Sequence, residues 1–491
     1  MTVTLSVDDR IRSIAAADPR RPAVIGVDDR DGEQVITWSR LERESAARAK
    51  LLPGRHDRAV IALDAPNRVE TVVRILACLR VSLPPLPLDP KAPPAERARL
   101  LQAAGATHTV YAWTERSGPT PAGASGPPGA AAPAGYLLAT GGSSGDPRVI
   151  AHPGPVSYDR KRVPNLLLTA TGWRSGQRQL VVGPLHHAAP FTACLEGLLD
   201  ANTIVLQEVF RPRSTVRIMA EHAVEWVQLT PTHMQWMTAA LERENPVPPS
   251  LRAIVHTAAP CPETVKRKWI ELLGPLRVFE FYAATENIGA TLVRGDEWLQ
   301  HPGTVGRGFC TQIRILDCRG HLAASVGEIY MRKGGFSGAA ALGAAAPGAA
   351  IRRTADGFSS VGDYGWLDSE RYLFLSPRRE DMVLVGGANV YPAEIEAALL
   401  EHPEILDCVV IGMSDDLIGS QLAAFVVHRP GARLDEGAVR SFCAAHLSPH
   451  KIPQSVHFID QVPRTESGKL HRRKLHDMAL APGERQESAN G

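Results

Sequence analysis

The stretch Ala59-Val60-Ile61-Ala62-Leu63 contains five consecutive apolar residues and predicts a short, buried β-strand. Apolar residues then recur every three or four positions between Val69 and Leu79, which is the spacing of one helix face. A second apolar run at Leu83–Leu88 and a second helical segment at Pro94–Ala104 follow. Because strands and helices alternate at this spacing, the segment predicts an α/β fold with a largely parallel sheet.

Length and composition limit the class of protein. At 491 residues the chain is too long for one compact core, so two or three domains are expected. The 54 basic and 52 acidic residues give a net charge of +2, which does not favour nucleic acid as a partner. No apolar run has the length of a membrane span, and charges at Asp8, Asp9 and Arg10 interrupt any signal peptide. A cytoplasmic protein that does not enter the membrane is therefore expected.

The seven cysteines are scattered and include no CxxC pair. This pattern favours a reduced setting over a disulfide framework or a zinc site. Two segments rich in Gly and Ala, 114–135 and 334–350, predict a surface linker and an irregular surface loop.

The character of the chain changes after about Ser376. Two helical patterns and three strand patterns follow and predict a small α+β domain: Ile395–Leu400 and Glu436–His446 as helices, and Asp407–Met413, Ala423–His428 and Ser455–Ile459 as strands. The boundary is placed near Arg379–Glu380, which gives domains of residues 1–379 and 380–491.

The loop Thr140–Arg148 follows a predicted strand at Tyr136–Ala139. Its three glycines allow close backbone approach to an oxyanion, and its hydroxyls add hydrogen-bond donors. It lacks the GxxxxGK[ST] order of a Walker A loop. By itself such a Gly/Ser segment is more often an ordinary turn.

Three further segments carry candidate chemistry. In Phe281–Glu286 an aromatic ring could stack on a base, a threonine could donate to phosphate, and a glutamate could hold a hard cation. In Val361–Gly365 an aspartate between glycines suits the vicinal hydroxyls of a ribose. In Arg378–Glu396 a charged break, a glycine pair and a helix-starting proline suggest a hinge into a new domain. A strand end with a capping threonine and an ordinary turn are the alternatives for the first two.

Lys469 lies in Pro463–Leu470, more than three hundred residues after the glycine loop. Two phosphate-handling segments so far apart predict a site assembled from separate parts of the fold. A solvated lysine in a basic tail is the alternative.

Together these segments resemble, in the same order, the adenylate-forming superfamily of acyl-CoA synthetases, adenylation domains and luciferases. The resemblance covers residues 20–480. It implies a large N-terminal domain with helix-flanked, parallel-rich sheets and a small barrel-like subdomain, followed by a small mobile α+β C-terminal domain. It implies ATP, Mg²⁺ and CoA as cofactors and a small-molecule carboxylic acid as substrate, and it leaves a homodimer open.

The resemblance also implies roles for individual residues. The catalytic residues would be Lys469, Thr285, Glu286 and His187, with Glu286 holding the metal. The residues that bind ATP or CoA would be Thr140, Gly142, Ser143, Ser144, Gly145, Arg148, Ala258, Ala259, Pro260, Tyr282, Asp363, Arg378, Gly386 and Gly387. The acid would contact His187, Met234, Ala283, Ala284 and Gly306. The C-terminal domain would rotate at Glu380, which removes Lys469 and brings the Gly386–Gly387 turn to the pantetheine of CoA.

Elementary electrostatics agrees with these roles. A carboxylate that attacks the α-phosphate brings two anions together, so positive groups are needed and catalysis depends on positioning. Lys469 would supply a mobile point charge.

Three residues depart from the family pattern. Arg148 stands where the family usually has lysine, Val361 replaces a usual Thr or Ser, and Gly141 replaces a common Ser. Arg148 keeps the charge but changes the geometry of any contact with pyrophosphate.

The segment Pro184–Thr192 narrows the class of carboxylic acid that is expected as the substrate. Relatives that activate amino acids place an acidic residue there to pair with the substrate ammonium, but this segment has no Asp or Glu. A buried ammonium without a carboxylate is costly, so an acid without an α-amino group is expected. For His187 a satisfied core histidine is the alternative. Thr230–Met237 and the small alanines suggest a wide, apolar pocket, although Met and Trp at helical spacing are more often core.

Weaker runs resemble actinobacterial acyl-CoA synthetases for fatty, steroid or polycyclic acids, and suggest a natural-product enzyme of the diterpenoid antibiotic type. These runs are His256–Pro262, Lys266–Ile270, Gly274-Pro275, Tyr282–Glu286, Glu297-Trp298, His301–Gly303 and Val305-Gly306. The alternatives are an enzyme that loads a carrier protein and a catalytically silent nucleotide- or acyl-binding protein. No feature of the sequence favours a luciferase-like oxygenase.

Overall fold

The structure is a computed structural model. It describes the chain outside residues 1–3, 29–31, 53–58, 105–107, 111–119, 122–133, 141–147, 162, 164, 245–246, 324, 335–339, 343–350, 377–382, 386–387, 416–418, 430, 465–469 and 481–491. The chain divides into two compact units. The first comprises Met1–Cys261 and Arg267–Leu375, and the second Pro262–Lys266 and Ser376–Gly491.

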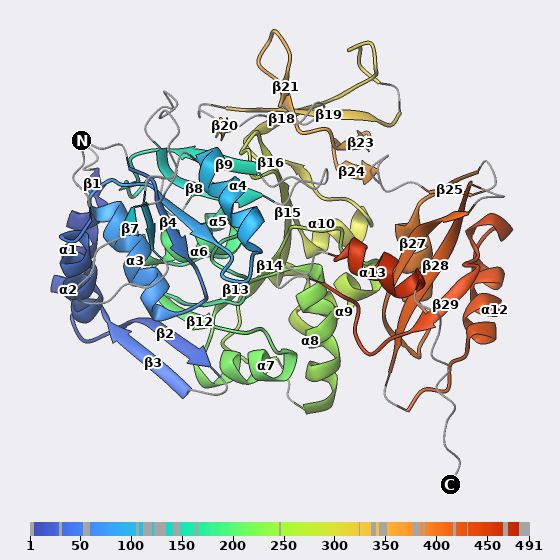
Figure 1. Cartoon of the computed structure of the whole chain (residues 1–491), viewed down its shortest axis with the longest axis horizontal. Coiled ribbons are helices and arrows are strands. Elements are labelled where there is room, and N and C mark those ends of the chain that lie inside the picture. Colours follow the sequence, from blue (N-terminus) through green and yellow to red (C-terminus); the bar gives the residue numbers. More distant parts are fainter. Residues whose placement is uncertain are drawn as a thin grey trace. The chain divides into compact units, whose positions relative to one another are not determined.

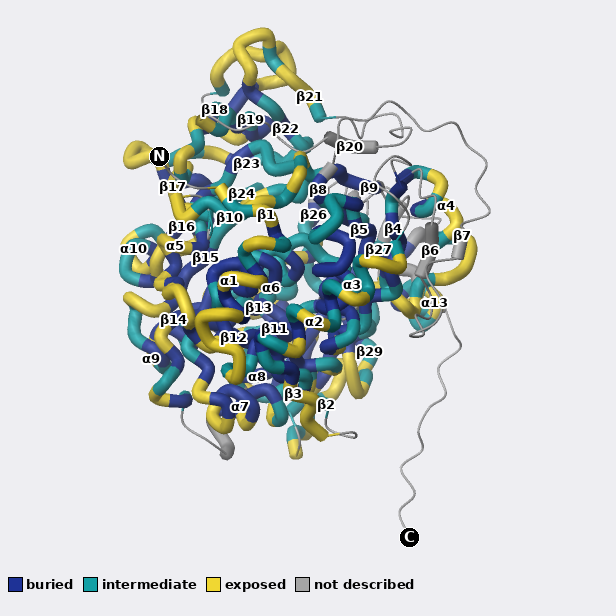
Figure 2. Tube along the Cα trace, turned by 90° about the vertical axis from the view of Figure 1, so that its left-hand side faces the viewer, coloured by how far each residue is buried: buried dark blue, intermediate teal, exposed yellow. Residues whose placement is uncertain are grey.

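A nine-stranded sheet forms the centre of the first unit (Figure 1). Six neighbouring strands run parallel: β15 (Val278–Ala283), β14 (Ala253–His256), β13 (Trp226–Leu229), β11 (Arg178–Val181), β12 (Thr203–Gln207) and β2 (Pro22–Asp28). Antiparallel strands β3 (Gly32–Thr37), β16 (Ala290–Arg294) and β17 (Arg307–Gly308) complete the edges. Every residue of β12 and β14 is buried, as expected for parallel strands covered on both faces (Figure 2).

The apolar stretch Ala59–Leu63 leads into and overlaps the first strand of a second, four-stranded sheet. Here β4 (Ile61–Asp64) pairs in parallel with β5 (Pro85–Leu88) and β6 (His108–Val110). Helix α3 (Val69–Arg80) follows β4, and α4 (Pro94–Ala104) follows β5. The predicted order of strand, helix, strand and helix is therefore confirmed. The fourth strand, β7 (Thr120–Pro121), pairs with β6 inside the segment 114–135, where only a linker was expected.

A three-stranded sheet carries the glycine loop. Strands β8 (Ala134–Thr140) and β9 (Arg148–Pro153) form a hairpin, and β20 (Ala340–Leu342) pairs with the outer side of β9. The prediction of an irregular loop at 334–350 is wrong at β20. Alanine and glycine have low strand propensity, so the local pattern hides this strand. It forms because the exposed edge of β9 offers unpaired backbone groups.

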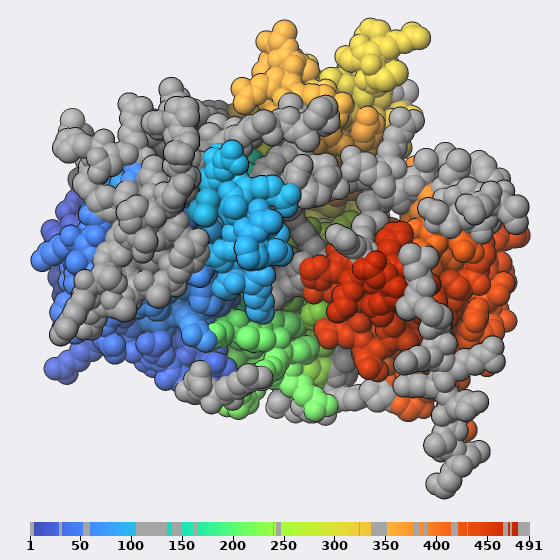
Figure 3. Space-filling model, viewed as in Figure 1, coloured from blue at the N-terminus to red at the C-terminus, as the bar shows by residue number. Residues whose placement is uncertain are grey.

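A small, largely antiparallel sheet follows and matches the expected subdomain. It contains β18 (Thr311–Leu316), β19 (Gly327–Lys333), β21 (Arg352–Arg353), β22 (Ser359–Ser360), β23 (Tyr364–Leu367) and β24 (Leu373–Ser376). The turns after β18 and β21, yellow and orange, protrude in the space-filling view (Figure 3).

The remaining elements of the described chain before Ser376 are mostly helices. They are β1 (Leu5–Ser6), α1 (Val7–Ala17), α2 (Trp38–Ala49), β10 (Ser157–Tyr158), α5 (Leu166–Thr169), α6 (Ala188–Leu199), α7 (Pro212–Glu221), α8 (Pro231–Glu244), α9 (Glu263–Leu273) and α10 (Gly295–Gln300). Within the described residues, no helix combines the length and apolar character that crossing a membrane requires. All seven cysteines are free.

The second unit is the α+β domain that the sequence predicts. Its sheet has the order β27 (Ile405–Asp415), β28 (Gly419–His428) and β29 (Ser455–Phe458), and a hairpin of β25 (Val383–Val385) and β26 (Ala388–Val390) precedes it. Helices α11 (Pro392–Leu399), α12 (Glu436–His446) and α13 (Arg472–Leu480) complete the unit. Asp435 caps α12 by accepting a hydrogen bond of 2.7 Å from the Ala438 N–H.

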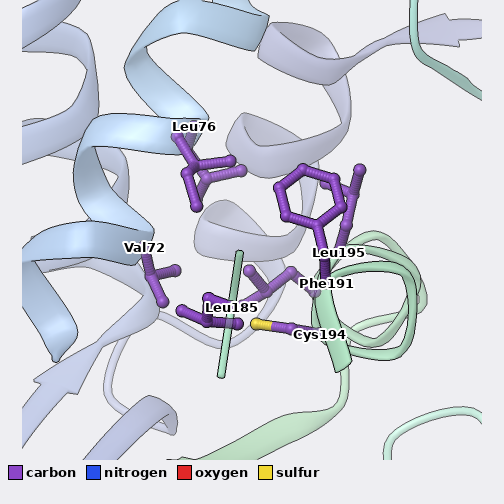
Figure 4. Close-up of a pocket in the computed structure, with 8 residues that line it drawn as sticks. Val72, Leu76, Leu185, Phe191, Cys194 and Leu195 are labelled. Carbon is purple, nitrogen blue, oxygen red and sulfur yellow. The ribbon is translucent and has the colours of Figure 1, made fainter. Parts of the chain in front are cut away.

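One small cavity of about 10 Å³ lies between α3 and α6 (Figure 4). Val72 and Leu76 line it from α3, and Phe191, Cys194 and Leu195 line it from α6. A void of this size could hold at most one water, and its apolar walls offer no hydrogen bonds. It is a packing defect and is too small for a substrate.

Candidate active site

Two predicted segments lie at the same edge of the nine-stranded sheet. The exposed residues Ala258, Ala259 and Pro260 follow β14, and Tyr282–Glu286 spans the end of β15. Because β14 and β15 are parallel neighbours, their carboxyl ends adjoin, which is where open α/β sheets bind ligands. Ala258 has a φ of +81°, an uncommon conformation for alanine.

Tyr282 and Asp363 are in direct contact although 81 positions separate them. The Tyr282 hydroxyl donates a hydrogen bond of 2.6 Å to Oδ2 of Asp363. The structure thus brings together the residue predicted to stack on adenine and the residue predicted to bind the ribose hydroxyls. The contact joins the carboxyl edge of the central sheet to the small antiparallel sheet.

The turn before β23 fixes the position of Asp363. Gly362 has a φ of +88°, which glycine adopts without a steric cost, and its N–H donates to Oγ of Ser360 at 3.0 Å. The carbonyl oxygen of Asp363 accepts a hydrogen bond of 2.9 Å from the Ile329 N–H. The carboxylate is therefore held on an ordered turn.

Thr285 and Glu286 lie on a tight turn and are partly exposed. The turn is closed by the Asn287 N–H, which donates to the carbonyl oxygen of Ala284 at 2.9 Å. Ala283 is exposed and Ala284 is partly exposed. In the described part of the chain, no group of three or more His, Cys, Asp or Glu could hold a metal. The partly exposed carboxylate of Glu286 is a ligand type that suits Mg²⁺, which commonly uses one or two carboxylates and takes its other ligands from phosphates and water.

Several predicted site residues lie outside the described residues: Gly142, Ser143, Ser144, Gly145, Arg378, Glu380, Gly386, Gly387 and Lys469. The backbones of Thr140 and Arg148 pair with each other where β8 and β9 meet the glycine loop. The roles of all these residues stay predictions.

The predicted acid-contacting residues occupy different environments. His187 is the N-cap residue of α6, is partly exposed, and has its ring centroid 4.5 Å from that of His186. Met234 in α8 is fully buried, and its carbonyl oxygen accepts a hydrogen bond of 3.1 Å from Nε1 of Trp269. Met234 thus lies in the packed interior, which is the alternative that the sequence left open for Thr230–Met237. Its contact with the acid stays a prediction.

Gly306 is buried and has a structural reason to be glycine. Its φ is +98°, and a Cβ there would lie 2.2 Å from the carbonyl oxygen of Leu292. No side chain fits without a shift of the β16 backbone.

Gly306→Ala is expected to lower the free energy of unfolding by about 3 kcal/mol, because the methyl group overlaps a backbone carbonyl. Gly176→Ala is the matched control, since Gly176 has a φ of +78° and nothing within 4 Å of an added Cβ. It should cost only about 1–2 kcal/mol. All eight tryptophans precede Ser376, so urea unfolding followed by tryptophan fluorescence reports on the first unit. Equal losses in the two variants would contradict this explanation of Gly306.

Sequence reasoning missed a buried titratable group in α6. Glu196 in α6 accepts hydrogen bonds from the backbone N–H of Asn165 at 2.6 Å and from its Nδ2 at 2.8 Å. Burial raises the pKa of Glu196 to about 7, while these hydrogen bonds and the charge of Lys333 oppose the rise. Burial lowers the pKa of Lys333, and the charges of Cys310 and Glu196 oppose this. A single carboxylate inside the apolar run Ala188–Leu199 was the available signal for Glu196.

Glu196→Gln is expected to make stability less dependent on pH. The raised pKa means that the folded state holds its proton more tightly than the unfolded chain, whose value is near 4.5. The contribution of Glu196 to stability therefore falls as the pH rises from about 4.5 to about 7. Urea midpoints of both proteins between pH 5 and pH 8 test this. The same pH slope in both proteins would contradict a raised pKa.

Comparisons with known proteins identify the family of the chain. The sequence profile of the AMP-binding enzyme family matches residues 11–132 and 130–338, and the profile of the AMP-binding enzyme C-terminal domain matches residues 394–469. The chain belongs to this family of adenylate-forming enzymes. Its class is that of the AMP-forming acid–thiol ligases, which use ATP, Mg²⁺ and CoA.

Named relatives are CoA ligases for different acids. The chain is 27% identical to a 2-succinylbenzoate–CoA ligase of Bacillus licheniformis, over 95% of this chain and 98% of that enzyme. It is 30% identical to that of Bacillus pumilus over 62% of this chain and 61% of that enzyme. It is 30% identical to a feruloyl-CoA synthase of Amycolatopsis over 68% of this chain and 67% of that enzyme.

Solved structures share the fold. The o-succinylbenzoate CoA synthetase of Bacillus subtilis with its acyl-adenylate matches with a TM-score of 0.73 and 22% identity, over 96% of this chain and 98% of that chain. The amide bond synthetase McbA of Marinactinospora thermotolerans matches with a TM-score of 0.72 and 22% identity, over 96% and 99%. These matches confirm the predicted fold with a large N-terminal and a small C-terminal domain.

Proposed function

We propose that this enzyme activates a bulky, apolar carboxylic acid without an α-amino group and transfers the acyl group to CoA. The acid and ATP would give an acyl-adenylate and pyrophosphate, and CoA would then give acyl-CoA and AMP. The hydrogen bond between Tyr282 and Asp363 carries the proposal, because it joins two distant segments that would both contact a nucleotide. The first turn of α6 has no acidic residue to pair with a substrate ammonium.

The described residues suit the parts of a nucleotide. The Tyr282 ring would stack on the base while its hydroxyl orients the Asp363 carboxylate toward the ribose hydroxyls. The Thr285 hydroxyl would donate to phosphate, and Glu286 would hold Mg²⁺, which neutralises phosphate charge when bound. Lys469 would bridge the acid carboxylate and the α-phosphate in the first half-reaction only.

A rotation of the C-terminal domain between the two half-reactions is part of the same proposal. Residues 1–379 would bind ATP and the acid, and residues 380–491 would rotate at Glu380 between the half-reactions. The narrower substrate classes, polycyclic or terpenoid acids of antibiotic biosynthesis, rest on the weaker sequence resemblance. We also propose that the enzyme is cytoplasmic, as expected from the sequence.

Asp363→Ala is expected to lower kcat/KM for ATP by about 100-fold, because both the ribose contact and the Tyr282 contact are lost. Tyr282→Phe removes only the hydroxyl and should lower it by about three- to tenfold. Acid-dependent ATP–pyrophosphate exchange measures both variants. Wild-type exchange in the Asp363→Ala variant would contradict the placement of the nucleotide.

A carrier-protein acceptor remains the second candidate within enzymes. The names of the relatives, 2-succinylbenzoate–CoA ligase and feruloyl-CoA synthase, favour free CoA. Rates with free CoA and with a phosphopantetheinylated carrier protein separate the two. A faster reaction with the carrier would replace CoA as the proposed acceptor.

A further inference from the structure

Lys333, at the end of β19, contacts the turn that carries Thr285 and Glu286. Its Nζ donates a hydrogen bond of 2.9 Å to Oδ1 of Asn287. Asn287 is also the residue whose N–H closes that turn onto Ala284. Its φ is +54°, a left-handed conformation that asparagine adopts more readily than most residues. Lys333 therefore binds the side chain of the residue that ends the turn.

The chain after Asn287 is fixed on the same β18–β19 hairpin. The Ala290 N–H donates to Oγ1 of Thr311 at 3.1 Å. A Cβ on Gly289 would lie 2.6 Å from Cγ2 of Thr311 and 2.9 Å from Cβ of Met331, so the backbone packs closely there. Thr311 pairs with Lys333 in the hairpin. Of these three attachments, the one from Lys333 is nearest to Glu286 in the chain and carries a charge.

The placement of Lys333 is energetically costly. Its side chain is partly buried, and burial disfavours an ammonium group unless hydrogen bonds and opposite charges compensate. Asn287 provides one hydrogen bond, and Glu196 from α6 provides an opposing charge. Two segments distant in sequence from Lys333, and from each other, thus interact with its ammonium group.

We propose that Lys333 is a positioning residue for acyl-adenylate formation. It holds Asn287, and through Asn287 it keeps Thr285 and Glu286 in the geometry that phosphate oxygens and Mg²⁺ require. The inference rests on the proposed function, because it assigns no chemistry to Lys333 itself. It differs from the role of Lys469, which would act directly on the reacting groups.

The test compares Lys333→Met, Asn287→Gly and the double variant. Glycine removes the acceptor but tolerates the positive φ of residue 287. Each single variant should lower kcat/KM for MgATP in ATP–pyrophosphate exchange by about 10- to 100-fold, as small misplacements of catalytic groups do. The double variant should be about as slow as the slower single variant, because both remove the same contact. Thioester formation from supplied acyl-adenylate should stay within about twofold of wild type.

Arg332→Met is the matched control. Arg332 is the adjacent cation on β19, and its guanidinium donates to the carbonyl oxygen of Asp356 and to the side chain of Gln312 instead. It should retain the wild-type exchange rate. Lys333→Arg keeps a charged donor and should recover part of the lost rate, which a folding defect alone would not explain.

Three outcomes overturn the proposal: an unchanged exchange rate in Lys333→Met, effects of the single variants that multiply in the double variant, or equal losses in both half-reactions. Failure of the proposed function is distinct, since wild-type enzyme would then show no exchange with any acid.

Discussion

Lys469→Ala is expected to reduce acyl-adenylate formation by at least about 10³-fold, since the variant lacks the charge that brings carboxylate and α-phosphate together. Thioester formation from supplied acyl-adenylate should remain within about threefold of wild type, because the proposed rotation at Glu380 removes this lysine before CoA reacts. ATP–pyrophosphate exchange measures the first half-reaction, and acyl-CoA formation by chromatography measures the second.

Lys474→Ala is a suitable control for Lys469→Ala. It removes a neighbouring charge of the same basic segment from α13, to which no role in the reaction is assigned. Both half-reactions should be normal in it. An equal loss of both half-reactions in Lys469→Ala would refute the two-state use of the C-terminal domain.

Asp407→Ala is expected to destabilise the second unit by about 3–5 kcal/mol, since it leaves a largely buried guanidinium without its carboxylate. Oδ1 of Asp407 in β27 lies 3.0 Å from Nη2 of Arg464, and their side chains are 4% and 14% exposed. The backbone of Arg464 also forms a bridge with Leu470, and the His471 N–H donates to the carbonyl oxygen of Pro463. The ion pair therefore attaches the chain at Arg464, just before the predicted catalytic segment, to the sheet.

The measurement for Asp407→Ala must report on the second unit, which has no tryptophan. Hydrogen–deuterium exchange of the β27 and β28 amides, read by mass spectrometry, should accelerate strongly in the variant. The double variant Asp407→Ala/Arg464→Met should recover part of the loss, because no unpaired charge remains. Unchanged exchange in Asp407→Ala would show that the pair contributes little.

Local pattern was sufficient for much of the fold. The apolar spacing between Val69 and Leu79 predicts α3, and α11, β27, β28, α12 and β29 have bounds within a few residues of those predicted. The elements β25, β26 and α13 were not predicted. Strand β20 was missed because its residues Ala340–Leu342 have little strand propensity of their own. It exists because β9 presents an open edge, and that information lies nearly two hundred residues away.

In the candidate site, too, some features could be predicted from the sequence and others appear only in the structure. The order of motifs predicts Tyr282 and Asp363 as separate site residues, and only the structure shows the hydrogen bond between them. Lys333 has no sequence signal, because neither its neighbours nor its spacing indicate that it lies beneath Asn287. Met234 follows a pattern shared by core and pocket residues, and only the packing places it in the interior.

Acid-dependent ATP–pyrophosphate exchange with the wild-type protein tests the central claim most directly. The panel would contain fatty, aromatic, polycyclic and terpenoid acids together with amino acids, each with ATP, Mg²⁺ and labelled pyrophosphate. The account predicts exchange with one or more bulky apolar acids, none with amino acids, and acyl-CoA and AMP once CoA is added. Exchange with amino acids alone would contradict the proposed substrate class, and no exchange with any acid would contradict the proposed enzyme.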